Sequence, residues 1–414
     1  MATFECFVGV DWGSENHHVC VLAADRAVLL DRAFAHTGQA LHDMVDAVLE
    51  GSEPSRVAVA IETPRGPVVE TLLERGVAVF AINPKQLDRF RDRHTTAGAK
   101  DDRRDALVLA DSLRTDAAAF HEVKASSALY VQLRELSRLH EELITERVAC
   151  GNRLVEQLRR YYPQPLSLDS VGNSPWLWAV LELAPTPAAA KRTSLAKFGS
   201  ILKAHRIRRH SPELVKSTLT TRPLSVGAGV AEAAEVRVRS LIARLRLVHD
   251  ELRNCERRVD ELFEALAHEA AAGVPSDAQI VRSIPGVGPV VGATLLVEAE
   301  ASIRERDYRT LRALAGVAPV TRATGKRSGK HAAVNMRRAC NKRLRNAVHY
   351  WIHSAIGKDP KVKARYAAQR ARGHSHGRAI RGVGDRMLGV LIAMLQKGTL
   401  YQVSTAPTCL EEKA

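Results

Sequence analysis

Two aspartates three residues apart, Asp102 and Asp105, are the residues in this sequence with the clearest capacity for chemistry. They lie in residues 97–116, where an apolar run at helical spacing follows them, so both carboxylates are expected on one helical face about a turn apart. Asp101 is placed to cap the start of this helix. Such a pair can bind a hard divalent cation when other carboxylates approach from nearby strands. Taken alone, the stretch is more typical of an exposed charged face.

Two further carboxylates end predicted buried strands. Residues 4–10 read as a strand that runs into Asp11, and residues 57–62 read as a second strand with Glu62 at its end. If these two strands pair side by side, four carboxylates gather at one end of a sheet. This cluster favours a Mg²⁺ site for phosphodiester chemistry, in which the metal orients the nucleophile and neutralises charge on the phosphate oxygens.

The neighbouring segments predict the elements that would position these carboxylates. Their spacing predicts strands over 17–23, 27–33 and 77–82 and helices over 39–50 and 67–75. The first two strands are separated by a short polar break and are expected to form a hairpin. Together these elements predict a mixed α/β domain.

A long helical region is predicted next, beginning with residues 128–162. Its clearest signal is a heptad pattern of alternating three- and four-residue spacings. The apolar positions of this pattern are Val238, Leu241, Leu245, Val248, Leu252, Cys255, Val259, Leu262 and Leu266. The pattern fits an antiparallel hairpin with residues 128–162 and equally a pairing with another subunit. Between the two helices lies a basic stretch that is either a small helical insert touching nucleic acid or a solvated surface.

Residues 280–299 contain two apolar helical stretches around Pro-Gly-Val-Gly-Pro. Gly286 and Gly288 allow the backbone to turn tightly and bring amides close to an anion. A helix-hairpin-helix of this kind grips a nucleic-acid backbone, and a plain helical turn is the alternative.

Residues 308–358 contain twelve Lys and Arg and no Asp or Glu. An uncompensated run of this length indicates phosphate contacts, and if half of these side chains met phosphates the log–log salt slope of binding would be roughly −5. The candidate contacts in its centre are Arg322, Lys326, Arg327, Lys330, Arg337, Arg338, Lys342, Arg343 and Arg345.

Two hydroxyls, Thr324 and Ser328, lie in the basic loop of this run. One interpretation is that they only donate hydrogen bonds to phosphate. The other is that Ser328 attacks a phosphodiester, with nearby cations and a metal lowering the barrier. The residues alone favour the first.

The overall composition fits a polyanionic partner. The 414 residues carry 61 Lys+Arg against 46 Asp+Glu, a net charge of +15, which favours nucleic acid. The six cysteines form no CxxC pair and read as reduced thiols, so we expect neither a zinc nor a disulfide framework. We expect no signal peptide and no membrane span, and therefore a cytoplasmic, nucleoid-associated protein.

These motifs, in this order, resemble one known family over nearly the whole chain: the DEDD-type insertion-sequence transposases of family one-ten, described as bridge-RNA-guided serine recombinases. VGVDWGSENHHVCVL, VAVAIETPRG and INPKQLDRFRDRHTTAGAKDDRRDALVLAD look like its first three motifs. SIPGVGPVVGATLL and LAGVAPVTRATGKRSGKHAAVNMRRACNKRLR look like its C-terminal region.

The resemblance implies a RuvC-like domain of RNase H fold with Asp11, Glu62, Asp102 and Asp105 as metal ligands. It also implies a coiled-coil middle that assembles a dimer or tetramer, and a C-terminal domain whose serine becomes joined to DNA. The implied partners are the DNA of the element ends and target, and a noncoding guide RNA. The active site is implied to combine the carboxylates of one subunit with the serine of another.

The chain departs from the family pattern at two places. Thr324 stands at the family's spacing from Pro319, whereas Ser328 keeps its distance to the segment 338–341, which reads as a four-residue lengthening before Ser328. We therefore take Ser328 as the nucleophile and Thr324 as the alternative. The second departure is Thr-Pro-Arg at 63–65, after Glu62, where the family has a smaller turn.

The sequence thus predicts a Mg²⁺-dependent DNA transposase, with a water-using junction nuclease and a non-enzymatic nucleic-acid scaffold as alternatives. The expected organisation is a catalytic domain at 1–120, a helical oligomerisation region with a basic insert at 121–275, a mostly helical C-terminal domain with the serine loop at 276–402, and a tail at 403–414.

Overall fold

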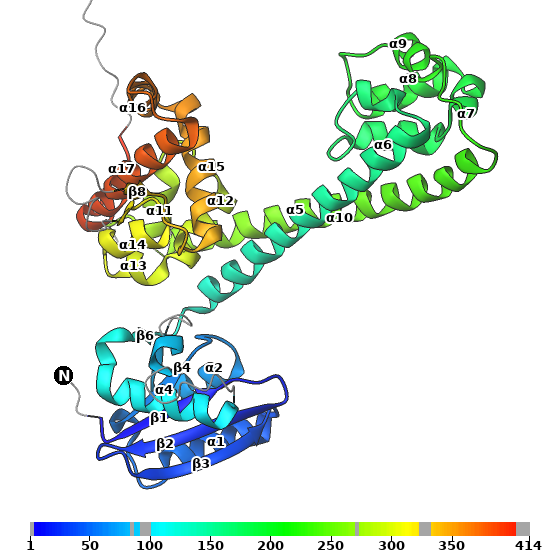
Figure 1. Ribbon diagram of the computed structural model, residues 1–414. Coiled ribbons are helices and arrows are strands. Elements are labelled where there is room, and N and C mark those ends of the chain that lie inside the picture. The colour runs from blue at the N-terminus through cyan, green and yellow to red at the C-terminus, as the bar shows by residue number, and fades with distance from the viewer. Residues whose placement is uncertain (1–3, 83–86, 92–100, 270–272, 323–332, 403–414) are drawn as a thin grey trace, which may run out of the picture. The chain divides into compact units, whose positions relative to one another are not determined.

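The computed structural model describes residues 4–82, 87–91, 101–269, 273–322 and 333–402. The chain divides into two compact units, Met1–Ser127 and Ala128–Ala414, and each is described by itself (Figure 1).

The first unit is built on a six-stranded sheet with the order β3-β2-β1-β4-β5-β6. Its strands are β1 (Cys6–Asp11), β2 (Asn16–Ala23), β3 (Val28–Ala35), β4 (Val57–Ile61), β5 (Ala78–Ala81) and β6 (His121–Val123). β1 pairs antiparallel with β2 and parallel with β4, so the predicted side-by-side pairing of the two carboxylate-bearing strands is confirmed. The hairpin of β2 and β3 is confirmed as well. β6 was not predicted, because three residues are too few to show a period.

Helices cover both faces of this sheet (Figure 1). The helices are α1 (Gly38–Leu49), α2 (Pro67–Glu74) and α4 (Asp102–Asp116), with short 3-10 turns at Pro54–Arg56 and Ala117–Ala119 and a helical stretch over 87–91. α1 and α2 pack on the face that carries Val8 and Val10 of β1. α4 packs on the opposite face, against alternate residues of β2 and β4. A mixed sheet with helices on both faces is compatible with an RNase H-like domain.

Two long helices, α5 (Ala128–Tyr161) and α10 (Val230–His268), form the backbone of the second unit. They pack antiparallel: Cys255 of α10 donates its Sγ–H to the carbonyl of Leu136 near the start of α5, whereas the end of α5 packs on residues 238–245. All nine predicted heptad positions of α10 are buried. Pairing with α5 therefore accounts for the apolar seam within one chain. Within the described residues, none of the helices is both long and apolar enough to cross a membrane.

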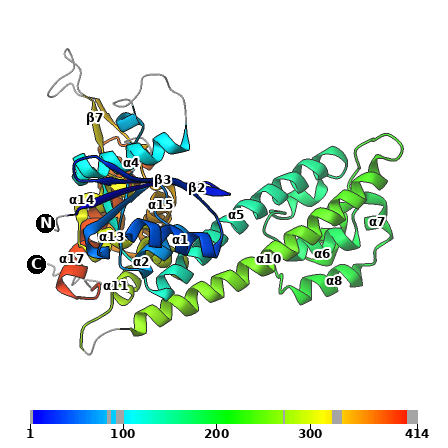
Figure 2. The same cartoon turned by 90° about the horizontal axis from the view of Figure 1, so that it is seen from below.

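The segment between α5 and α10 folds as a small helical insert whose core is shared with the end of α5 and the start of α10 (Figures 1 and 2). It contains a 3-10 turn at Gln164–Ser167 and the helices α6 (Pro175–Leu183), α7 (Pro187–Arg192), α8 (Leu195–Ala204) and α9 (Pro212–Leu219). Trp176, Trp178 and Phe198 are buried at its centre. Asp169 accepts hydrogen bonds from Ser174 and from Trp176 Nε1, the latter at 2.9 Å. The insert is thus a folded helical element, and its contact with nucleic acid stays a prediction.

The C-terminal part of the second unit is a helical cluster with one two-stranded hairpin. Its elements are α11 (Asp277–Ser283), α12 (Pro289–Glu298), α13 (Glu300–Arg304), α14 (Tyr308–Leu314), β7 (Val320–Arg322), β8 (Ala333–Asn335), α15 (Lys342–Lys358), α16 (Pro360–Ala371) and α17 (His376–Lys397). The antiparallel β7–β8 hairpin was not predicted.

Candidate active site and nucleic-acid interface

Asp11 and Glu62 lie at the same edge of the sheet in the first unit. Val10 of β1 is in register with Ile61 of β4, and the two strands are parallel, so the next residue on each strand carries a carboxylate. Both carboxylate residues are half-buried. The sheet therefore brings together two of the four predicted site residues.

Gly9 allows α4 to lie directly on β1. A Cβ at this position would be 1.9 Å from the carbonyl oxygen of Ala106 and 2.6 Å from the amide nitrogen of Ala110, so any side chain would push the helix away. This backbone contact sets the first turn of α4 against the strand that ends at Asp11. Asp105 in that turn is 3% exposed, whereas Asp102 is exposed.

Arg91 holds the carboxylate of Asp105 in a two-pronged ion pair. Its Nε lies 2.7 Å from Oδ1 and its Nη2 lies 2.9 Å from Oδ2, and a third bond of 2.7 Å reaches Asp88. Burial alone would lower the pKa of Arg91, but the bond to Asp105 and the charges of Asp105, Asp88 and Glu62 raise it. Glu62 therefore lies in the field of the same guanidinium, and this edge of the sheet attracts positive charge.

The donor set suits a hard divalent ion, because carboxylate oxygens are its preferred ligands. In the described part of the chain, however, no three His, Cys, Asp or Glu side chains stand close enough together to hold a metal. The guanidinium of Arg91 takes both oxygens of Asp105 in this arrangement. The chemistry of the residues therefore fits a metal, but binding would require Arg91 to leave Asp105.

A second set of polar contacts supports α4 and was missed by sequence reasoning. Asp31 on β3 accepts hydrogen bonds from Arg103 Nε at 2.5 Å and from His18 Nε2 at 2.7 Å, which ties the first turn of α4 to the antiparallel strands. Asp101 caps α4, as predicted, by accepting a bond from the Arg103 amide at 3.3 Å. The polar residues His18 and Asp31 within the two predicted hairpin strands were the signal that could have pointed to this contact.

The predicted nucleophile and its neighbours lie outside the described residues. Thr324, Lys326, Arg327, Ser328 and Lys330 belong to residues 323–332, between β7 and β8. Their roles stay predictions. After β8, Arg338 and Lys342 are exposed to solvent, and Arg337 and Arg345 are half-buried.

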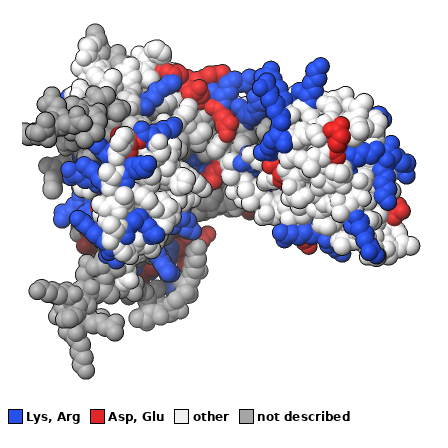
Figure 3. Space-filling model, turned by 90° about the horizontal axis from the view of Figure 1, so that it is seen from above, with Lys and Arg blue, Asp and Glu red and all other residues white. Residues whose placement is uncertain are grey.

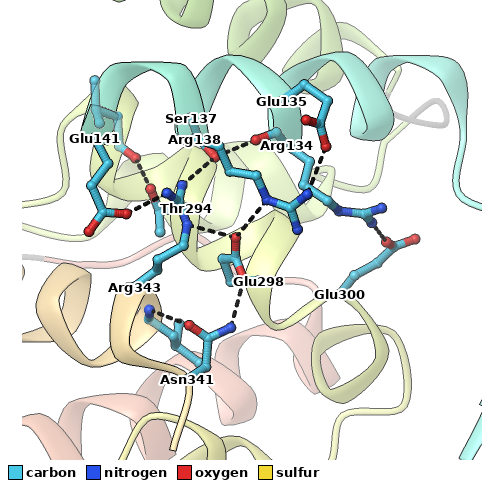
Figure 4. A network of polar contacts seen from close by, with 12 residues as sticks. Arg134, Glu135, Ser137, Arg138, Glu141, Thr294, Glu298, Glu300, Asn341 and Arg343 are labelled. Carbon is cyan, nitrogen blue, oxygen red and sulfur yellow. Dashed lines mark hydrogen bonds and ion pairs between the residues drawn. The ribbon is translucent and has the colours of Figure 1, made fainter. Parts of the chain in front are cut away.

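Arg343 is bound within the protein (Figure 4). Its Nε lies 2.9 Å from Oε1 of Glu298, and its terminal nitrogens bond to Glu141 and, at 3.0 Å, to Ser137. The same Glu298 accepts a bond of 2.6 Å from Asn341, the residue that caps α15. This network fixes the start of α15 to α5 and α12 and uses the charge of Arg343 internally.

Nearby, Arg134 of α5 pairs with Glu300 at 2.5 Å, so the polar seam continues along α5 (Figure 4). Arg138 lies 3.8 Å from Glu298 and 2.8 Å from Glu135. The long helix and the C-terminal helices are therefore joined by ion pairs as well as by apolar contacts.

The glycines of the predicted hairpin have different surroundings. Gly286 has a φ of 87°, and a Cβ there would be 2.6 Å from the amide nitrogen of Ala355 and 2.9 Å from the carbonyl oxygen of Trp351. A Cβ at Gly288 would meet no atom within 4 Å. Gly286 thus packs against α15, and of the two only Gly288 has open space beside it.

Basic side chains are spread over the face of the insert seen in Figure 3. The exposed ones are Lys191, Arg192, Lys197, Lys203, Arg206, Arg208 and Arg209. Between residues 187 and 222 the only acidic side chain is that of Glu213. Arg209 pairs with Asp169, and the other exposed cations give the insert a second positive surface.

Comparisons with known proteins agree across both units. A family model described as a transposase, of the DEDD type of IS110, matches residues 8–163, which include all four carboxylates. A second model, described as the transposase IS116/IS110/IS902 family, matches residues 278–367.

Whole-length relatives carry related names. The chain is 34% identical over 399 residues, 94% of each protein, to a Streptomyces coelicolor protein named for the mini-circle transposase of IS117. It is 26% identical over 408 residues, 96% of this chain and 95% of the relative, to the 43.6 kDa protein of insertion element IS110 from the same organism. A Sinorhizobium fredii protein named for transposase y4uE is 48% identical over 207 residues, which span 49% of this chain and 58% of that protein. The chain belongs to the IS110 family of insertion-sequence transposases and is a DNA transposase.

Proposed function

We propose that this transposase excises and inserts its element by cutting and rejoining DNA through a phosphoserine bond at Ser328, with Mg²⁺ held by Asp11, Glu62, Asp102 and Asp105. The observation that carries the metal part is the parallel β1–β4 pair, which ends in Asp11 and Glu62 beside the helix that bears Asp105. The nucleophile rests on the spacing of Ser328 within the family pattern.

The serine step balances without an external energy source. The Ser328 oxygen attacks phosphorus and forms a new ester bond, while the phosphorus–oxygen bond to the leaving strand breaks and that strand's oxygen takes up a proton. In rejoining, a strand hydroxyl attacks the phosphoserine and returns the proton and the free serine. One phosphodiester is therefore exchanged for another at each step.

Mg²⁺, when bound, would neutralise charge on the phosphate oxygens. For this to happen Asp105 must exchange its guanidinium partner for the ion. We therefore expect Arg91 to compete with metal for Asp105. Without metal, an Arg91→Gln variant should be less stable than the wild type. Mg²⁺ should raise the melting temperature of this variant more than that of the wild type. In each protein the stabilisation by the ion is RT ln(1 + [Mg²⁺]/Kd), and the Kd should be lower for the variant.

The matched control for this test is Arg56→Gln, which breaks the exposed ion pair with Glu5 in the same unit. Its response to Mg²⁺ should equal that of the wild type. A second variant, Asp11→Asn, should weaken the stabilisation by Mg²⁺. If Mg²⁺ stabilises the Arg91→Gln protein no more than the wild type, the ion does not bind at Asp105.

The nucleophile is tested by a plasmid excision assay. Ser328→Ala should abolish recombination and Thr324→Ala should leave it largely intact. A denaturing gel adds the chemistry: the serine mechanism leaves protein covalently attached to DNA, whereas the alternative nuclease, which shares the carboxylates but uses water, leaves none. The reverse pattern in the two variants would move the nucleophile to Thr324.

We also propose that the chain acts as a homo-oligomer with a coiled-coil middle. Its helix-hairpin-helix would contact the DNA backbone.

We further propose that a noncoding RNA of the element guides the protein. The exposed basic surfaces of the insert and the C-terminal region support a second nucleic-acid partner. Sequencing of the RNA that copurifies with the protein tests the guide. RNA that does not map to the sequence flanking the gene would count against it.

A further inference from the structure

A hollow of about 290 Å³ opens between the first turns of α15 and α17, at the base of the β7–β8 hairpin. Val317, just before β7, and Met336, just after β8, form the side of this hollow next to the hairpin. A volume near 300 Å³ is at the small end of the range for ligand pockets, so one small ligand would fill it.

Two arginines, Arg345 of α15 and Arg381 of α17, give the pocket its charge. Among the described residues, the guanidinium of Arg345 bonds to the side-chain oxygen of Asn346, at 3.2 and 3.4 Å. Within the described residues, neither arginine has a carboxylate within 4.0 Å, since the acids of this region, Asp359 and Asp385, are bound elsewhere.

This lack of partners sets the two arginines apart from others in the same unit. Arg306 is paired with Asp277 at 2.6 Å, and Arg312 bonds to Asp385 at 2.8 Å. Arginines that hold the helices together are thus neutralised. Those that line the pocket are not, and the pocket therefore favours an anion.

The charges of the two arginines both act on His349, which lines the same pocket. Partial burial, the neighbouring histidines His376 and His353, and then Arg345 and Arg381 together hold the pKa of His349 below its ordinary value. Both guanidinium groups therefore act on a third residue of the same lining. Nη1 of Arg381 lies 3.5 Å from the Cβ position of Gly377, so this side chain folds back over the first turn of α17.

The lining also contains apolar side chains. Val348 and Ile380 are almost fully buried, and Val317 is 9% exposed. A ligand that fills the pocket must therefore carry an anionic group for the arginines and an apolar face for these side chains. A nucleotide has both, because a phosphate is joined through the sugar to a flat base.

We propose that this pocket binds one unpaired nucleotide of a nucleic-acid strand, with its phosphate between Arg345 and Arg381 and its base against Val317, Val348 and Ile380. A base within a duplex must first be unstacked at a cost of about a few kcal/mol, so a single strand is the preferred ligand. The proposal does not depend on Ser328 being the nucleophile.

The test uses short oligonucleotides with one central 2-aminopurine, whose fluorescence rises when the base leaves its stack. The full-length protein should raise the fluorescence of the single strand several-fold and that of the matched perfect duplex much less. Parallel titrations with DNA and RNA of the same sequence show which strand the pocket takes. No rise with either strand would overturn the proposal.

Gly377→Leu is the decisive variant, because it fills the pocket and keeps every positive charge. The nearest atom to the new side chain would be the movable end of Arg381, so the helix can accept it. This variant should lose the fluorescence rise and keep its affinity for duplex DNA, measured by anisotropy. A full rise in Gly377→Leu would refute the pocket.

A charge-matched pair completes the test and does not depend on the fold of the first variant. Arg381→Gln should weaken single-strand binding about tenfold and reduce the log–log salt slope by about one, as expected for one lost phosphate contact. Arg372→Gln removes an exposed arginine just after α16 and should leave the fluorescence rise unchanged. Equal losses in the two variants would mean general attraction to a basic surface, which would also overturn the proposal.

Discussion

The ion-pair network around Glu298 makes a quantitative prediction about the stability of the second unit. Glu298 has a side chain only 8% exposed and accepts bonds from Arg343 and Asn341. Replacing Glu298 by Gln keeps the shape of the side chain but removes its negative charge, so Arg343 loses its most buried ionic partner. The change therefore probes the buried charge alone.

The magnitude follows from the burial of the two partners. Removing one member of a buried ion pair costs about 3–5 kcal/mol. The side chain of Arg343 is 20% exposed and keeps its bond to Glu141, so we expect a smaller cost than this range, about 2–3 kcal/mol. At about 2–4 °C per kcal/mol, the melting temperature should fall by roughly 5–10 °C.

The assay is thermal and urea unfolding of the full chain, followed by circular dichroism at the helix band. Glu261→Gln is the matched control, because its partner Arg258 forms a surface pair in which both side chains are more than half exposed. That change should cost less than about 0.5 kcal/mol. If Glu298→Gln costs no more than Glu261→Gln, the network does not hold α15 to the rest of the unit.

Two further predictions concern the backbone and the pH response. Gly286→Ala should destabilise the protein by about 1–3 kcal/mol in urea unfolding, because its positive φ and the contact with Ala355 leave no room for a Cβ, whereas Gly288→Ala should be nearly neutral. An equal loss in both would refute the packing role. Burial alone would raise the pKa of Asp169, but the hydrogen bonds that the carboxylate accepts lower this pKa below its ordinary value of 3.8. The ionised side chain therefore stabilises the folded state above about pH 4, and this stabilisation is lost as the pH falls through the pKa of the folded state. Unfolding of Asp169→Asn should therefore show a weaker loss of stability below about pH 4 than the wild type, and an unchanged acid limb would contradict this assignment.

The carboxylate edge could be predicted from sequence because its signals are local. A buried strand shows itself within a few residues, so Asp11 and Glu62 could be assigned to strand ends, and the spacing of Asp102 and Asp105 indicated a helix start. A side-by-side pairing of β1 and β4 was expected, and the structure shows that the pair is parallel. What the pattern could not supply was Arg91, whose partner Asp105 lies 14 residues further along the chain.

Partners that lie far away in the sequence also limited what could be predicted for the basic run at residues 308–358. Its composition indicates phosphate contacts, but composition does not show which arginines have internal partners. Arg343 meets Glu298, 45 residues earlier, and Arg312 meets Asp385, 73 residues later, both outside the run. The β7 and β8 strands were missed for another reason, since each has three residues and shows no period.

The internal partners change what a salt titration of this protein measures. Arg312 and Arg343 are neutralised within the fold, so at most ten of the twelve cations of residues 308–358 can meet phosphate. If half of these do so, the log–log salt slope becomes about −4.5. The two kinds of arginine also respond differently to the same substitution. Arg343→Gln should lower the free energy of unfolding and leave the salt slope unchanged, because a charge that the fold has already neutralised releases no counterion when DNA binds. Arg345→Gln should make the salt slope less negative and leave the free energy of unfolding nearly unchanged.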